Sequence, residues 1–301
     1  MSALRVLLPD DYRAAETLAY HGRDSASLSE RVVGTRIEKV LELESGPALL
    51  ALDLHPGEAR AQFDRDLSEP ERAAALGIVH RMLGLQSDPA GFEQLTAAAL
   101  LAAARPGLRI PLTATVFEAV CWAVIGQQIN LTFAATLRRA MIGLAGRPHA
   151  PSGLVAHPRQ EEVAALDPAV LTTRQFSRSK ARYLVDTAAA IASGALPLER
   201  LAEAGPAEAE AALTALRGIG PWTARYILLR GFGFADVAPV GDSGLATGLQ
   251  RLHGLDARPS VAAQEALMRD FAPHRSLATL HLWASLADQP AERRLQPVSA
   301  A

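Results

Sequence analysis

Short apolar runs separated by polar residues mark the first 88 residues of this chain. Glu38, Lys39 and Glu42 fall between apolar residues, as the solvated face of a half-buried strand requires. A helical run follows at 69–85. Residues 1–88 are therefore expected to form an α+β domain with an antiparallel sheet. The runs rich in Val, Leu and Ile cover residues 5–8, 31–33, 35–43 and 47–54.

The rest of the chain has the pattern of a helical protein, with capping residues before the helices and glycines after them. Thr115 and Glu118 have the spacing of a capping box at the start of one helix. Arg178, Lys180 and Arg182 are expected to form a solvated face of another helix, with a phosphate contact as the alternative. Further helices are predicted at 131–145, 177–193, 207–216, 221–231 and 260–271.

A Pro/Gly linker at residues 105–111 divides the helical part. We expect the chain after Gln289 to be a loose tail. The predicted organisation is a central helical domain over 113–234 and a second helical domain made from 89–112 and 235–301.

The segment Gly218-Ile219-Gly220 lies between two predicted helices, with Pro221 at the first position of the second. Glycine permits a positive φ and a close approach of another backbone. The N–H groups from Gly220 to Thr223 would then point outward at the positive end of a helix dipole, where a phosphate binds well. An ordinary helix–turn–helix corner is the alternative. The longer pattern Leu-x-Gly-Ile-Gly-x-x-Thr-Ala favours a hairpin that grips a DNA backbone without reading bases.

Asp242 follows Gly220 by 22 residues and opens another helical run. An aspartate at that place is commonly an N-cap, and capping alone would explain it. A catalytic carboxylate is the second interpretation. The two roles can coexist, because a capping carboxylate can turn one oxygen toward a ligand.

Composition limits the alternatives for this 301-residue chain. Apolar residues make up 49%, with few aromatics, which suits a largely helical protein; no apolar run is long enough to span a membrane. The N-terminus lacks the pattern of a signal peptide. The single Cys121 excludes a four-cysteine iron–sulfur cluster and fits a reducing cytoplasm. A net charge of −2 predicts only modest non-specific DNA affinity.

The hairpin followed by Pro239-Val-Gly241-Asp242 resembles the helix–hairpin–helix superfamily of DNA glycosylases, and the chain is similar to its AlkA-like DNA-3-methyladenine glycosylase II family. The resemblance implies a mostly α fold with an N-terminal α+β domain and an active-site cleft between two helical domains. It makes Asp242 the catalytic residue. Gly241 is a departure, since relatives can carry a second acidic residue there.

Further site residues are implied by the same resemblance. The pocket for the extruded base would be lined by Trp222, Tyr226, Trp283 and Leu18. Main-chain carbonyls at the hairpin, those of Thr214, Leu216 and Ile219, would hold a monovalent cation, Na⁺ or K⁺. The predicted DNA contacts are Gln127, Gln128 as a wedge in the duplex, Gly218, Ile219, Gly220, Trp222 and Thr223.

The function implied is hydrolysis of the bond between sugar and alkylated base in double-stranded DNA, as in base excision repair. Trp222 stands where strand-cutting relatives have a lysine, which implies a monofunctional enzyme. We expect a cytoplasmic, nucleoid-associated monomer with no membrane partner and no required cofactor. Two alternatives stay open: a non-catalytic module that binds damaged DNA, and a glycosylase for oxidised or mismatched bases.

Overall fold

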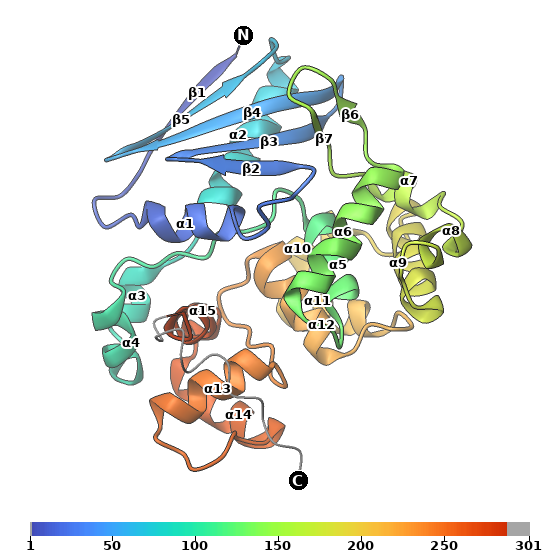
Figure 1. Ribbon diagram of the computed structural model, residues 1–301. Helices are drawn as coiled ribbons and strands as arrows, with labels where there is room; N and C mark the ends of the chain where they lie inside the picture. Colours follow the sequence, from blue (N-terminus) through green and yellow to red (C-terminus); the bar gives the residue numbers. More distant parts are fainter. Residues whose placement is uncertain (1, 288–301) are drawn as a thin grey trace.

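The computed structural model describes residues 2–287. A sheet lies at the top of Figure 1, with one group of helices to its right and a second group below. Within the described residues, five strands form an antiparallel sheet in the order β1-β5-β4-β3-β2, which confirms the predicted sheet. The strands are β1 (Ala3–Leu7), β2 (Glu30–Val33), β3 (Arg36–Leu43), β4 (Gly46–His55) and β5 (Glu58–Phe63).

Two helices accompany the sheet, α1 (Ala14–His21) and α2 (Glu69–Leu83). Val79 and Met82 of α2 are fully buried against the apolar side of the strands. Ser68 and Glu71 form a complete capping box at the start of α2. The sheet and α2 thus share one apolar core.

The central helices surround α5 (Val116–Gly126), which is buried along nearly its whole length. Two short strands, β6 (Pro148–His149) and β7 (Leu154–Val155), interrupt them. Most predicted helices are found with boundaries within a few residues of the predictions, and several begin at a capping side chain, such as Asn130 for α6 and Ser177 for α9. The other central helices are α6 (Leu131–Ala145), α7 (Gln160–Ala164), α8 (Pro168–Thr172), α9 (Arg178–Ala192), α10 (Leu198–Ala204), α11 (Pro206–Thr214) and α12 (Pro221–Ile227).

The second helical group joins segments far apart in the sequence. Phe92 from the first segment packs on Phe271 from the second, with ring centroids 6.5 Å apart. The tail after Gln289 lies outside the described residues. The elements are α3 (Pro89–Glu93), η1 (Thr96–Ala98), α4 (Ala99–Ala104), α13 (Ser243–Leu252), α14 (Val261–Met268), η3 (Arg269–Phe271) and α15 (Arg275–Ser285). No helix within residues 2–287 is long and apolar enough to cross a membrane.

The helix predicted to end at Gly231 continues beyond it. After α12 the chain forms a π-helical segment, η2 (Leu228–Phe232), and Gly233 ends it with a φ of +80°. A Cβ on Gly231 would lie 2.9 Å from the Cβ of Ala119. Gly231 therefore allows close packing on α5 and does not terminate the helix.

A buried ion cluster joins the sheet to the central helices. The Lys39 ammonium donates to Glu30 and to Glu118 at 3.1 Å each, and Arg138 lies 3.3 Å from Glu30. Burial opposes ionisation of Glu30, but the attraction of Lys39 and Arg138 outweighs it and holds the pKa of this carboxyl well below its usual range. The predicted capping box at α5 is only half formed: Thr115 accepts the Glu118 N–H, while the Glu118 carboxylate faces Lys39.

Arg81 of α2 links the sheet domain to the segment before α5 and to η2. Its guanidinium donates to the carbonyls of Thr113 and Ala114 at 3.2 Å, and to the carbonyl of Gly231 in η2. Thr113 in turn donates its N–H to the carbonyl of Arg230. The linker, the sheet domain and the helix that follows the hairpin are therefore fixed to one another.

Candidate active site and nucleic-acid interface

In the hairpin between α11 and α12, one of the two glycines has the positive φ that glycine permits, and the other has an extended backbone. Gly218 has a φ of +90°, and a Cβ there would lie 2.3 Å from the ring of Tyr183, so only glycine fits. Ile219 is 4% exposed, and its N–H donates to the carbonyl of Leu216 at 3.1 Å. A Cβ on Gly220 would meet no atom within 4 Å. The hairpin is thus packed on the Gly218 side and open on the Gly220 side.

The end of α5 is tied to this hairpin. The Gln127 side-chain amide donates to the Gly218 carbonyl at 2.8 Å and to the Thr223 hydroxyl at 2.9 Å. The Lys180 ammonium donates to the carbonyls of Ile125 and Gln127. The prediction that Lys180 is solvated is therefore wrong: its charge is buried against the carbonyl end of α5, where a cation is favoured.

The two glutamines predicted to contact DNA have different environments. Gln127 uses its amide nitrogen to hold the hairpin, so it fixes the end of α5 to the hairpin. Gln128 is exposed and has a φ of +56°, in the left-handed region that is uncommon for glutamine. The turn at Gln128 therefore projects from a loop that Gln127 and Lys180 anchor.

Asp242 is the N-cap of α13, as one of the two interpretations requires. Its Oδ1 accepts the Leu245 N–H at 2.8 Å. The preceding Gly241 has a φ of +88°, and its N–H donates to the Gln264 side chain at 2.8 Å. The capping bond leaves Oδ2 to other partners, so capping does not exclude a further role.

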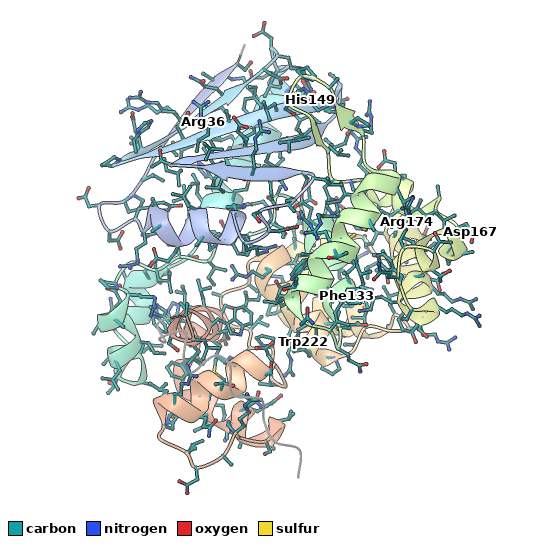
Figure 2. The ribbon with its side chains drawn as sticks, viewed as in Figure 1. Arg36, Phe133, His149, Asp167, Arg174 and Trp222 are labelled. Carbon is teal, nitrogen blue, oxygen red and sulfur yellow. The ribbon has the colours of Figure 1, made fainter. Side chains whose placement is uncertain are left out.

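Two indoles hold the Asp242 carboxylate. The Trp283 Nε1–H donates to Oδ1 at 2.8 Å, and the Trp222 Nε1–H donates to Oδ2 at 3.3 Å. A Cβ on Gly244 would lie 3.1 Å from Trp283, so a larger residue would crowd this indole. Figure 2 shows Trp222 where the central helices meet the lower group. The fold thus brings three predicted site residues together from α12, α13 and α15.

Tyr226 lies between the two indoles. Its ring centroid is 5.8 Å from that of Trp222 and 6.2 Å from that of Trp283. Burial raises the pKa of Tyr226 to about 12, so the phenol stays neutral near pH 7. The three aromatic residues form a continuous wall beside Asp242.

Two arginines extend this wall, and the sequence analysis missed both. The Arg230 guanidinium lies 4.4 Å from the centroid of Tyr20 and 5.6 Å from that of Trp283. The Arg23 guanidinium also lies over Tyr20, 4.1 Å from its ring centroid, and is 5.1 Å from the centroid of Trp122. Such contacts stabilise a cation over an aromatic face. Part of the aromatic surface is therefore already occupied by protein cations.

A spacing in the sequence could have revealed Arg230. Trp222, Tyr226 and Arg230 follow one another at intervals of four, which places them on one helical face. Leu18, the predicted fourth member of the pocket, is half-buried and packs against the core of the sheet, and its place in the pocket stays a prediction. Tyr20, two residues further along α1, is the side chain that reaches Arg230.

The carbonyls of Thr214, Leu216 and Ile219 stay a predicted cation site. The Leu216 oxygen accepts the Ile219 N–H and keeps a second lone pair. Within residues 2–287 there is no cluster of His, Cys, Asp and Glu side chains that could hold a metal.

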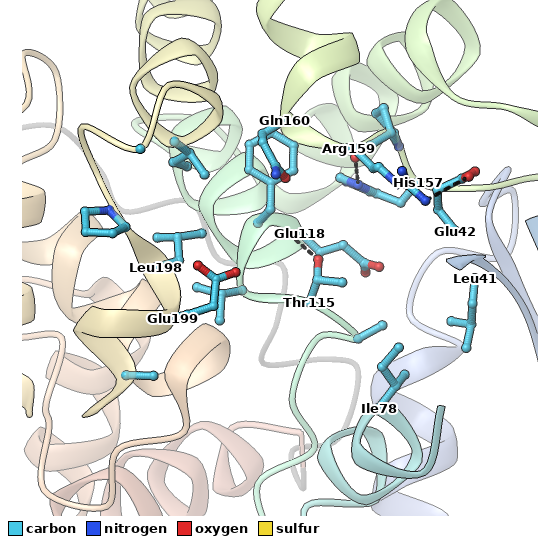
Figure 3. A pocket seen from close by; sticks show the side chains of 18 of the residues that line it. Leu41, Glu42, Ile78, Thr115, Glu118, His157, Arg159, Gln160, Leu198 and Glu199 are labelled. Carbon is cyan, nitrogen blue, oxygen red and sulfur yellow. Dashed lines mark hydrogen bonds and ion pairs between the residues drawn. The ribbon is translucent and has the colours of Figure 1, made fainter. Parts of the chain in front are cut away.

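A cavity of about 470 Å³ lies between the sheet and the central helices. Figure 3 shows Leu41, Ile78, Leu198, Glu118 and His157 around it. None of the predicted site residues lines it. The candidate site is therefore Asp242 with the aromatic wall beside it, and not this cavity.

Comparison with known proteins agrees with this geometry. Residues 121–274 match the family model described as HhH-GPD superfamily base excision DNA repair protein. The chain is 28% identical to the DNA-3-methyladenine glycosylase of Bacillus subtilis, over 93% of this chain and 96% of that one. It is 33% identical to DNA-3-methyladenine glycosylase 2 of Escherichia coli, over 79% and 82%.

The fold is also similar to a solved structure, the 3-methyladenine DNA glycosylase of Archaeoglobus fulgidus. The TM-score is 0.83, with 22% identity and coverage of 95% of this chain and 98% of the other. The chain belongs to the HhH-GPD superfamily of base excision DNA repair proteins and, within it, to the DNA-3-methyladenine glycosylase II family.

Proposed function

We propose that this protein is a monofunctional DNA glycosylase that releases alkylated bases, such as 3-methyladenine and 7-methylguanine, from double-stranded DNA. The observation that supports this most strongly is the Asp242 carboxylate held by two indole N–H groups beside an aromatic wall. The glycine hairpin directly precedes Trp222 in the chain, and there it would grip the backbone of the damaged strand.

The chemistry follows from the charge of the substrate. A base inside a duplex must first rotate out of the stack. Alkylation at a ring nitrogen makes the base cationic, which weakens its bond to the sugar and removes the need for a general acid. Positive charge develops on the sugar as the bond breaks, and a carboxylate below the ring stabilises it.

The hydrogen bonds of Asp242 indicate which oxygen acts. A carboxylate has about four acceptor positions. Leu245 and Trp283 occupy Oδ1, and Trp222 occupies one position on Oδ2. The free position on Oδ2 is the one we assign to the sugar or to the attacking water.

Trp222 supports hydrolysis without strand cleavage. An indole has no amine that could form a Schiff base with the sugar. The product would therefore be an intact strand with an abasic site. We further propose that the protein acts as a monomer without a required cofactor, that Na⁺ or K⁺ binds at the hairpin carbonyls, and that the enzyme is cytoplasmic and nucleoid-associated.

The test is to incubate methylated duplex DNA with the protein and with Asp242→Asn, and to measure the free bases by chromatography. We expect a loss on the order of 100-fold or more for the variant. Asp167→Asn is the matched control, because Asp167 is also an N-cap, with a bond of 2.8 Å to the Ala169 N–H, but it caps α8 away from Trp222 (Figure 2). Strand breaks should appear only after alkali treatment.

Two results would favour the alternatives. If the wild-type protein binds the damaged duplex and releases no base, it is a damage-binding module. If it releases oxidised or mismatched bases and leaves alkylated ones, the substrate class is different.

A further inference from the structure

A buried side chain of α14 is bound to the loop that leads into Asp242. Gln264 in α14 is 4% exposed. Its amide oxygen accepts the Gly241 N–H at 2.8 Å, and its amide nitrogen donates to the carbonyl of Pro259 at 2.9 Å. Both ends of this amide are therefore bound to backbone, one of them at the residue before Asp242.

Gly241 sets the direction in which the chain enters α13. Its φ of +88° lies in the left-handed region. The Asp242 N–H closes the turn by donating to the carbonyl of Pro239 at 3.1 Å. A glycine has few conformational restrictions of its own, because it lacks a Cβ. The bond to Gln264 restrains this backbone instead, one residue away from the carboxylate.

The same helix is joined to α12, which carries the indole bound to Oδ2. The Arg225 guanidinium of α12 donates to Glu265 of α14 and to Glu210 of α11, at 2.8 Å each. Gln264 and its neighbour Glu265 thus connect α14 both to the loop before α13 and to the helix of Trp222. The carboxylate and one of its indole partners are therefore held in a common frame.

The backbone position of Asp242 matters for the chemistry. The attraction between a carboxylate and a developing positive charge falls with distance, and a misplacement of about 1 Å can slow a reaction on the order of 100-fold. Two indoles and the Leu245 N–H orient the carboxyl group of Asp242. The bond between Gln264 and Gly241 restrains the backbone from which that group extends.

We propose that Gln264 is a positioning residue for base release: through the Gly241 N–H it fixes the backbone of Asp242 and thereby the place of Oδ2 opposite the sugar. This inference deepens the proposed function and rests on it, because it takes Asp242 as the group that faces the sugar. Gln264 is buried and acts through Gly241, without touching the substrate.

The first test is single-turnover release of 7-methylguanine from methylated duplex DNA. Gln264→Met keeps a side chain of similar length and loses both hydrogen bonds, so release should slow at least about tenfold. Its affinity for a duplex with a neutral tetrahydrofuran abasic analogue should stay close to that of the wild type. Gln250→Met is the matched control, because the Gln250 amide also donates to backbone carbonyls, those of Leu255 and Asp256 at 3.3 Å, but at the other end of α13. Its release rate should equal that of the wild type.

Gln264→Glu separates positioning from a general loss of packing. A neutral carboxyl group can accept from Gly241 and donate to Pro259, whereas an ionised one can only accept. Burial keeps a carboxyl group neutral to a higher pH than in water. The release rate relative to the wild type should therefore be largely restored at about pH 5.5 and fall as the pH rises to about 9. The same ratio for Gln264→Met should not change with pH.

A binding assay tests the positioning of Asp242 without base release. A duplex with a cationic pyrrolidine in place of one deoxyribose mimics the charge that develops on the sugar. The wild type and Gln250→Met should bind it at least about tenfold more tightly than the tetrahydrofuran duplex. Gln264→Met should lose most of this preference.

Three outcomes decide the matter. If Gln264→Met releases bases at the wild-type rate and keeps the preference for pyrrolidine, the inference is overturned while the proposed function stands. If Gln264→Met and Gln264→Glu lose activity equally at every pH, lost packing explains the effect and the inference is overturned as well. If the wild type releases no alkylated base, the proposed function fails, and the pyrrolidine preference alone decides the role of Gln264.

Discussion

Replacing Trp283 by Phe tests whether the indole N–H groups matter for the chemistry. The phenyl ring can still pack near Tyr226 and Arg230, but the 2.8 Å bond to Oδ1 of Asp242 is lost. A hydrogen bond to a charged group contributes about 1.5–3 kcal/mol. Because this bond fixes the carboxylate where positive charge develops on the sugar, we expect its loss to raise the barrier by that amount and the rate of base release to fall roughly 10- to 150-fold.

Trp222→Phe is the matched comparison. Its bond to Oδ2 is longer, at 3.3 Å, so its loss should slow release only a few-fold. The assay is single-turnover release of 7-methylguanine from methylated duplex at saturating enzyme, which separates the chemical step from DNA binding. A larger loss for Trp222→Phe than for Trp283→Phe, or no loss for either, would refute the reasoning that Oδ1 must be fixed by an indole.

Two further predictions concern stability. Gly218→Ala should lower the free energy of unfolding by about 3 kcal/mol, because its φ would be strained and its Cβ would clash with Tyr183. Gly220→Ala should change the free energy of unfolding by less than about 0.5 kcal/mol, because Gly220 has a φ of −88° and faces open space. Equal losses of stability in urea unfolding would contradict this difference. Burial lowers the pKa of His157 and of His281 from 6.5 to about 4, so the unfolded chain takes up protons first as the pH falls. Stability should therefore drop between pH 6.5 and 4, by about 2 kcal/mol per imidazole at pH 5, and His281→Phe should remove its share of that slope.

Local signals explain why much of the fold was predictable. Asn130 and Gly146 bound α6 as predicted, because a cap acts within a few residues of itself. Gly231 was misinterpreted because its role depends on Ala119, more than a hundred residues earlier. The sequence shows that a glycine is required, but not whether the requirement comes from the turn or from a neighbouring helix.

The residues of the candidate site likewise divide into those that a local pattern reveals and those whose role depends on distant contacts. The hairpin and Asp242 stand out by pattern, since both lie at helix ends with restrictive backbone geometry. The roles of Gln127 and Lys180 depend on contacts with residues 91 and 53 positions away in the chain, respectively. A lysine within a polar helical stretch looks like a solvated residue until the carbonyl end of α5 is placed against it.

The three carbonyl bonds of Arg81 carry a mechanical consequence. Because these bonds tie α2 to residues 113–114 and to η2, a hinge motion between the sheet domain and the central helices would have to break them. Most of the bending needed for recognition then falls on the nucleic acid. Its stiffness varies with the steps that flank a lesion, and pyrimidine–purine steps deform most easily. A stiff protein of this kind would favour lesions flanked by easily deformed base steps. This sequence preference would arise without any contact between the protein and a flanking base.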